Sequence, residues 1–303
     1  MKRPIWLRLP PALSRRVRSS PQPADKAGGR LAALRAGLSN RLVVLDFNGF
    51  LLRGALVVSR RGEPRILVHG ESHLPTIEAA LTQVLDQLRA GGEPLPRRCV
   101  AASIQVLAAE VHLPVAPNQP RKRQQMLDLI RWELEPLVGQ ATLHWNLGAV
   151  LTAMGYLTPA QRLEIAGDQR RHNGLPLRFG DRAVELGHIT DSQLERALAG
   201  QKLIQGASAE FDCDYAAMAG EPHDGHWAWL GTAVDRGVRS DWYAACKAQG
   251  LRLQYLYPRA GLGALAVTAE PEWDGDGVEI RLDGLVSWSC RAGRLTVFRE
   301  ESR

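Results

Sequence analysis

A pattern that occurs twice, 32 residues apart, constrains the fold of this chain more than any other feature. The first copy spans residues 146–169 and the second spans residues 178–201. Five positions carry the same residue in both copies: Gly148 and Gly180, Gly155 and Gly187, Thr158 and Thr190, Gln161 and Gln193, Gln169 and Gln201. Because a repeated sequence corresponds to a repeated structural unit, the two copies are expected to fold alike.

Each copy is predicted to form two helices joined by a tight turn. Gly155 or Gly187 is expected to end the first helix, since glycine enters the left-handed backbone region without strain. Thr158 or Thr190 is a good N-cap for the second helix. Pro159 suits the first position of that helix in the first copy. Two such hairpins would pack into a small four-helix unit.

The second copy resembles the tandem motif in the N-terminal domain of type II secretion and type IV pilus assembly ATPases. The matching residues are Arg178, Phe179, Gly180, Ala183, Val184, Gly187, Ile189, Leu194, Leu198 and Gln201. In the subclass called MshEN, two copies of this motif bind cyclic di-GMP. The resemblance implies a small all-helical tandem-repeat module at residues 141–206.

For cyclic di-GMP, the resemblance implies ligand contacts at the start and at the final glutamine of each copy. These positions are Asn146, Leu147, Gly148 and Gln169, then Arg178, Phe179, Gly180 and Gln201. Arginine pairs in a bidentate way with O6 and N7 of guanine, and glycine lets a backbone approach a phosphate closely. The first copy departs from the motif at Asn146, where arginine is expected, and at Arg162 and Ala166, where leucines are expected. The alternative is a structural or protein-docking module without a ligand.

The segments on both sides of the repeat read as alternating strands and helices. Before it, the sequence predicts strands at 42–46, 51–58, 66–69, 99–103 and 111–114, and helices at 76–89 and 119–135. Asn48-Gly49 is a tight-turn signal, and Pro136 is expected to stop the last helix. After the repeat, it predicts strands at 227–234, 251–256, 278–284, 286–290 and 295–298, with a helix at 240–249.

Two of these segments resemble the actin-like platform proteins of type IV pili, the PilM class, and their type II secretion counterparts. The segments are Leu45-Asp46-Phe47-Asn48-Gly49 in the first hairpin and the Arg-Trp-Glu-x-Glu run at residues 131–135. The resemblance implies an α/β fold: half of an actin-like (ribonuclease H-like) domain in two parts, residues 41–140 and 207–303. The helical module would interrupt it.

In actin-like ATPases an Asp-x-Gly turn in each half holds the nucleotide phosphates. The corresponding residues here are Asp46 with Gly49, and Asp283 with Gly284, and both loops depart from that spacing. The chain also stops at Arg303, about where the second half of such a fold would begin. ATP binding is therefore not expected, and Asp46 is expected to cap its own turn instead.

The first 41 residues carry ten basic side chains and one acidic side chain. Such a basic arm, residues 1–40, suits an anionic partner. An inner-membrane surface is favoured over nucleic acid, and the alternative is a solvated tail. The four cysteines, Cys99, Cys213, Cys246 and Cys290, lack metal-binding spacing and are expected to be reduced and buried.

No catalytic constellation is found; for example, the sequence contains no Gly-Lys dipeptide and hence no P-loop. The sequence predicts a non-enzymatic scaffold of a type IV pilus or type II secretion platform, cytoplasmic and peripheral to the inner membrane. Its partners would be inner-membrane subunits and the assembly ATPase, with cyclic di-GMP as the one cofactor considered. The alternative is an actin-like ATP-binding protein of the same machinery.

Overall fold

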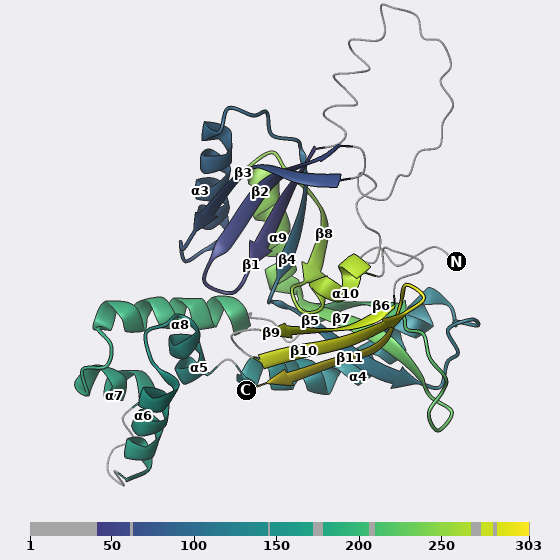
Figure 1. Cartoon of the computed structure of the whole chain (residues 1–303). Helices are drawn as coiled ribbons and strands as arrows, with labels where there is room; N and C mark the ends of the chain where they lie inside the picture. The colour runs from purple at the N-terminus through teal and green to yellow at the C-terminus, as the bar shows by residue number, and fades with distance from the viewer. Residues whose placement is uncertain are drawn as a thin grey trace, which may run out of the picture.

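A computed structural model describes residues 41–60, 63–144, 146–171, 178–205, 210–267, 274–280 and 284–302. The basic arm, residues 1–40, and Asp283 lie outside the described residues. The described part has the mixed α/β structure that the sequence predicts (Figure 1). None of its helices combines the length and apolarity needed to span a bilayer.

The largest sheet has five strands in the order β3-β2-β1-β4-β8. Its strands are β1 (Arg41–Phe47), β2 (Leu52–Arg60), β3 (Glu63–Ser72), β4 (Arg98–Ser103) and β8 (Arg252–Pro258). The first three form an antiparallel meander, while β4 and β8 run parallel to β1. Parallel neighbours need crossover connections, and these contain helices α3 (Ile77–Ala90) and α9 (Arg236–Ala248).

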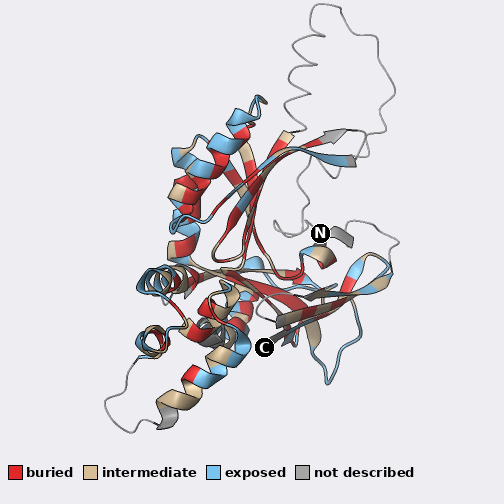
Figure 2. Cartoon of the chain, turned by 60° about the vertical axis from the view of Figure 1, so that its left-hand side comes forward, coloured by how far each residue is buried: buried red, intermediate tan, exposed pale blue. Residues whose placement is uncertain are grey.

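Both faces of this sheet are buried, because its central strand is apolar in nearly every position. Val43, Leu45 and Phe47 of β1 belong to the same core cluster as the inner faces of α3 and α9. Leu42 belongs to a second cluster on the opposite side, where two smaller sheets cover the strands. Figure 2 shows buried residues along the strands and exposed residues on the outer sides of the helices. A near-continuous apolar run is typical of strands covered on both faces.

The outer edge of β3 is protected near both of its ends. The side chain of Gln87 in α3 accepts from the Glu71 N–H at 2.8 Å and donates to the Glu71 carbonyl at 2.9 Å. Pro64 has no N–H to offer, and the β2–β3 register shifts between Leu56 and Val57. Capping, proline and a register irregularity are devices by which proteins protect sheet edges.

The second sheet has the antiparallel order β5-β7-β6. Its strands are β5 (Val106–Leu113), β6 (Phe211–Ala217) and β7 (Trp227–Asp235). Helix α4 (Arg123–His144) packs its buried Met126, Ile130 and Leu134 against this sheet.

The predicted end of α4 was wrong: the helix begins at Arg123 and continues through Pro136 to His144. Pro136 is exposed, so its ring lies on the solvent side of the helix. The carbonyl of Trp132, which loses its helical partner at this proline, belongs to a residue that is 77% exposed. Water can therefore satisfy that carbonyl, and the packing of Leu134 outweighs the local cost of the proline.

The third sheet is the antiparallel meander β11-β10-β9 near the end of the chain. Its strands are β9 (Gly275–Ile280), β10 (Gly284–Arg291) and β11 (Arg294–Ser302). Val286, Cys290 and Phe298 join the core cluster that covers the opposite face of the large sheet, together with the short helix α10 (Leu262–Val267). The N–H of Phe298 donates to the Glu110 carboxylate of β5 at 2.8 Å, which ties this sheet to the second one.

Four helices lie between α4 and β6 in the chain. They are α5 (Leu147–Ala153), α6 (Pro159–Arg171), α7 (Phe179–Glu185) and α8 (Asp191–Gln205). They enclose a cluster of their own, which includes Val150, Leu151, Ile165, Ala183 and Ala197. Figure 1 shows them as a group beside the sheets, with α8 nearest to the large sheet.

Two elements were missed by the sequence analysis, namely β6 and α10, and α9 begins earlier than predicted. In β6, Asp212 and Asp214 have low strand propensity, but their charges are met by Arg236 and Arg123. Helix α9 begins at Arg236 because the Asp235 carboxylate accepts from the Val238 N–H at 3.0 Å and caps it.

Candidate functional site

The carboxyl ends of the parallel strands β1, β4 and β8 form the edge where open α/β sheets bind ligands. The β1–β2 loop, residues 48–51, lies at this edge and contains the predicted phosphate turn. The site is therefore built from this loop, the residues just after β4 and β8, and the helices that cover them.

Asp46 is held by an arginine of the chain itself. Its Oδ1 accepts from Nε of Arg259 at 2.8 Å, and both side chains are about one-third exposed. The backbone N–H of Arg259 donates to the Ser103 carbonyl at 3.1 Å, so the arginine is fixed at the end of β4. The carboxylate that would serve a nucleotide site is thus occupied by an internal cation.

The expectation that Asp46 caps its own turn was wrong, because Asn48 does so. Oδ1 of Asn48 accepts from the N–H of Phe50 at 3.0 Å and of Leu51 at 2.9 Å. The Asn48 N–H in turn donates to the Leu51 carbonyl at 3.2 Å. These bonds use the backbone donors of residues 48, 50 and 51, which a phosphate would otherwise need.

Helix α8 covers the same loop. Gly49 has a φ of +101°, a conformation that favours glycine. A Cβ built on Gly49 would lie 2.9 Å from Cδ1 of Ile204 in α8. One built on Gly200 of α8 would lie 3.1 Å from the Phe50 ring. Contacts this close show that α8 and the loop fit together without space for a ligand between Gly49 and Ile204.

The backbone donors that follow β8 are also taken by the protein. The Glu279 carboxylate of β9 accepts from the Gly261 N–H at 3.0 Å and from the Gly263 N–H at 2.7 Å. The predicted second phosphate turn lies elsewhere in the fold. Gly284 begins β10 and pairs with Ser302 of β11, while Asp283 is outside the described residues.

Two of the repeated glycines, Gly148 and Gly180, pack against side chains, whereas Gly155 and Gly187 face open space. A Cβ on Gly148 would lie 3.1 Å from the Phe179 ring and 3.3 Å from Nε of Arg162. The first of these contacts comes from the second copy and the other from the same copy. Gly148 therefore serves the packing between α5, α6 and α7.

The contacts of Gly180 mirror those of Gly148. A Cβ on Gly180 would lie 2.4 Å from Cδ1 of Leu194 and 3.0 Å from Cδ2 of Leu147. Leu147 and Phe179 occupy equivalent positions in the two copies, as do Arg162 and Leu194. The copies are therefore related by an approximate twofold relation in which each covers the glycine of the other.

The two copies also share the cap of their second helix, as the sequence predicts. The Thr158 N–H donates to Oε1 of Gln161 at 2.8 Å, and the Gln161 N–H donates back to Oγ1 of Thr158 at 3.3 Å. In the second copy the same pair of bonds joins Thr190 and Gln193, at 2.9 and 3.3 Å. This reciprocal arrangement is a capping box.

Asn146 and Arg178 begin the two copies but differ in what they do. Oδ1 of Asn146 accepts from the Ala149 N–H at 3.0 Å and caps α5. Arg178 holds the same position before α7 without a side-chain cap bond, and its guanidinium is exposed and without a partner within the described residues. Gln169 and Gln201, the remaining predicted ligand contacts, are half-buried.

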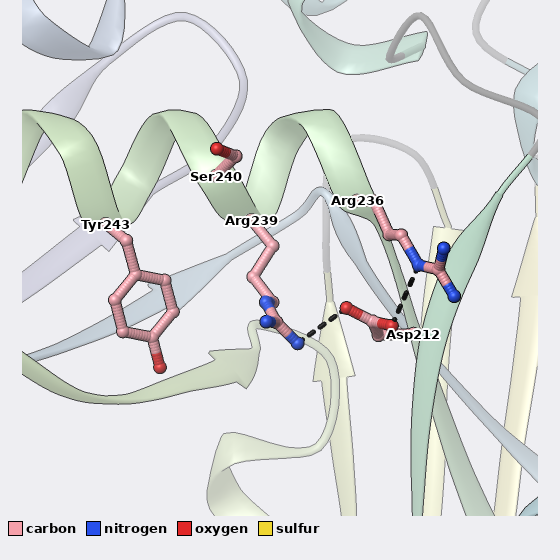
Figure 3. A pocket seen from close by; sticks show the side chains of 5 residues that line it. All are labelled: Asp212, Arg236, Arg239, Ser240 and Tyr243. Atoms are coloured by element: carbon pink, nitrogen blue, oxygen red, sulfur yellow. Dashed lines mark hydrogen bonds and ion pairs between the residues drawn. The ribbon is translucent and has the colours of Figure 1, made fainter.

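A pocket of about 340 Å³ lies between β6 and α9, and no sequence motif pointed to it. Asp212 accepts from Nε of Arg236 at 3.1 Å and pairs with Arg239 at 2.5 Å, as Figure 3 shows. The Arg239 guanidinium also lies 5.9 Å from the Tyr243 ring centroid. Asp212 pairs with both arginines and Glu210 pairs with Arg236, so two carboxylates balance the two cations and little charge is left for an anion.

The Arg-Trp-Glu-x-Glu run of α4 places its first two side chains very differently. Arg131 lies over the Phe211 ring, 5.4 Å from its centroid, a cation–π contact. Trp132 is 77% exposed, the highest exposure among the large apolar side chains of the described residues. Tryptophan is enriched among the residues that dominate protein interfaces, so Trp132 is a candidate docking contact.

No protein-family model matches the sequence, and no curated protein matches it either. Among solved structures, the chain is similar to one from a PilM-PilN type IV pilus biogenesis complex. The two are 13% identical with a TM-score of 0.45, over 86% of this chain and 61% of the other, so this chain spans less than two thirds of that length. It is also similar to a Bacteroides thetaiotaomicron protein of unknown function with an actin-like ATPase fold. That comparison gives 8% identity and a TM-score of 0.35, over 87% of this chain and 70% of the other.

The packing of the repeated glycines predicts unequal effects of two matched substitutions. Gly180→Ala should lower the free energy of unfolding by about 1–3 kcal/mol, because the new methyl group would overlap Leu194. Gly148→Ala should cost less, since its contacts are longer and the Arg162 side chain can move aside. Urea unfolding followed by circular dichroism measures both, and equal effects would contradict the packing described for Gly180.

Proposed function

We propose that this chain is a non-enzymatic scaffold of a type IV pilus or type II secretion inner-membrane platform. Its core would be half of an actin-like domain, interrupted by a helical tandem-repeat module at residues 141–206. The observation that carries the proposal is the closed ligand edge of the large sheet, where Arg259 holds Asp46 and Ile204 covers Gly49.

The closed edge argues against the alternative of an ATP-binding protein. A nucleotide at the β1–β2 loop would have to displace Ile204 and compete with Arg259 for Asp46. It would also meet a loop whose donors Asn48 has already taken. Breaking these contacts costs binding energy that a ligand must supply, and no free cation of the described edge is positioned to compensate it.

The assignment to a pilus or secretion platform rests on the residues of the first hairpin and of α4 that resemble the PilM class. The strand order adds support, since a meander continued by two parallel strands suits half of an actin-like domain. Trp132 gives the scaffold a docking contact. Tryptophan is enriched among residues that dominate protein interfaces, and here Glu133 and Glu135 lie exposed beside it.

For the helical module, protein docking or a structural role is the favoured reading. Gly148 is covered by Phe179 and Arg162, and Gly180 by Leu147 and Leu194, so the faces that would approach a ligand phosphate are already filled. The second candidate is a cyclic di-GMP sensor. The exposed and unpartnered Arg178 is the observation that favours it.

The proposed location is the cytoplasmic face of the inner membrane, held there by partner subunits. The basic composition of residues 1–40 supports a contact with anionic lipid headgroups, because each lysine or arginine near such a surface adds about 1 kcal/mol of attraction. The partners would be inner-membrane subunits and the assembly ATPase of the same machine.

Calorimetric titration with magnesium ATP, paired with a phosphate-release assay, tests the non-enzymatic reading. We expect neither saturable binding nor release above the buffer background at millimolar nucleotide. The closed β1–β2 loop is the reason. Saturable binding that disappears in Asp46→Ala would favour the ATP-binding alternative.

Trp132→Ala tests the docking role of α4. In a two-hybrid or co-purification assay against cytoplasmic segments of the cognate inner-membrane subunits, we expect a loss of about tenfold or more, because a central interface tryptophan contributes strongly. Val278→Ala in β9 is the matched control, since Val278 is also a large exposed apolar residue, at 64%. Equal binding by both variants would remove Trp132 from the interface.

Calorimetric titration with cyclic di-GMP separates the two readings of the helical module. We expect no saturable heat, because side chains fill the space beside Gly148 and Gly180. Micromolar binding that is lost in Arg178→Ala would instead establish the sensor. Arg196→Ala, which removes another exposed arginine of the module, is the control that should retain such binding.

A further inference from the structure

Two thiols face each other inside the main core. Cys99 of β4 and Cys246 of α9 are both 0% exposed, and their Sγ atoms are 3.7 Å apart. Both are free cysteines, separated by 147 residues of sequence. Within the described part, Cys213 lies near the Leu127 carbonyl and Cys290 lies in the second core cluster, so neither belongs to this pair.

We propose that Cys99 and Cys246 are a modification site, at which a peroxide converts the two thiols into a disulfide that fastens α9 to β4. The sulfur atoms of a disulfide are about 2 Å apart. The two Sγ atoms therefore need to approach by less than about 2 Å. Small changes in the side-chain torsion angles and a small shift of α9 toward β4 would provide this.

The hydrogen bond between the thiols makes the two sulfur atoms chemically unequal. The Cys99 S–H donates to Sγ of Cys246, which lowers the pKa of Cys246 and raises the pKa of Cys99. Burial adds to the rise at Cys99 and opposes the fall at Cys246. While the thiols are hydrogen-bonded, Cys246 thus loses its proton more readily than Cys99, and the thiolate is the reactive form of cysteine.

The chemistry balances with hydrogen peroxide as the oxidant. The Cys246 thiolate attacks one peroxide oxygen, the O–O bond breaks, and the hydroxide that leaves takes up a proton to become water. This gives a sulfenic acid at Cys246. The Cys99 sulfur then attacks the Cys246 sulfur, the S–O bond breaks, and the second hydroxide leaves as water with the Cys99 proton. The two thiols lose two electrons and the peroxide gains them.

Since both sulfur atoms are buried, the oxidant reaches them when α9 moves away from the sheet. The C-terminal end of α9 is held by Gln249. Its Nε2 donates to Oγ1 of Thr82 in α3 at 2.8 Å, and its Oε1 accepts from Arg89 of α3 at 3.4 Å. Together with the buried Trp242 and Ala245, these contacts hold α9 on the sheet, so weakening them should raise the rate of oxidation.

The position of the pair gives the disulfide a structural consequence. Everything between β4 and α9, namely the second sheet and helices α4–α8, leaves the main sheet after Ser103 and returns through Asp235. A bond between Cys99 and Cys246 would link the two elements, β4 and α9, that flank this inserted segment. It would also restrict the unfolded chain over a long loop, which raises stability.

The experiment treats the purified full chain with hydrogen peroxide, blocks the remaining thiols under denaturing conditions and maps the peptides by mass spectrometry. We expect an intramolecular cross-link between the peptides of Cys99 and Cys246 and a rise in Tm of roughly 5–10 °C that dithiothreitol reverses. Cys213→Ala should behave like the unmodified chain. A cross-link that uses Cys213 or Cys290, or oxidation without any cross-link, would overturn the proposal.

A second measurement concerns the route. Gln249→Ala should speed disulfide formation several-fold because it frees the end of α9, whereas Gln125→Ala on the exposed face of α4 should leave the rate unchanged. Cys99→Ala should abolish the rise in Tm. If that variant does not fold, the peptide map of the unmodified chain still tests the cross-link. An unchanged rate in Gln249→Ala would overturn the opening of α9 as the route.

Discussion

The structure depends on the burial of both faces of the five-stranded sheet. Strand β1 is apolar on each side, so its hydrophobic area must be covered twice. Helices α3 and α9 cover one face. The other is covered by residues from the two smaller sheets and from α10. Helices α5–α8 are not needed to cover either face of this sheet, and together they enclose a core of their own.

The same constraint explains why the ligand edge is closed. An excursion that begins after β4 and ends at α9 must start and finish near the carboxyl ends of the parallel strands. Helix α8 is the last helix of the module before the chain returns, and its Ile204 reaches the β1–β2 loop. The charge that remains at this edge, Asp46, is met by Arg259 from the end of β8. The path of the chain and the pairing of charges therefore both close the same edge of the sheet.

The sequence predicted those features that depend on neighbouring residues. The first hairpin, helix α3 and the N-caps at Thr158 and Thr190 follow from local signals, and the structure confirms them. It did not predict features that depend on distant residues. Arg259 lies 213 residues from Asp46 in the chain, and the continuation of α4 past Pro136 depends on packing against another element. The role of the glycines at the start of each copy was ambiguous for the same reason. A small residue suits the approach of a phosphate or of a neighbouring side chain equally well, and only the fold shows Phe179 over Gly148.

The protected edge of β3 has a consequence for how this molecule can assemble. With Gln87 bound to both backbone groups of Glu71, and with Pro64 lacking a donor, a second copy has no continuous ladder to extend. Pairing of two copies through the β3 edge of the large sheet is thereby disfavoured. Assembly with other proteins is left to side-chain surfaces such as the one around Trp132, where charge and shape can select one partner over another.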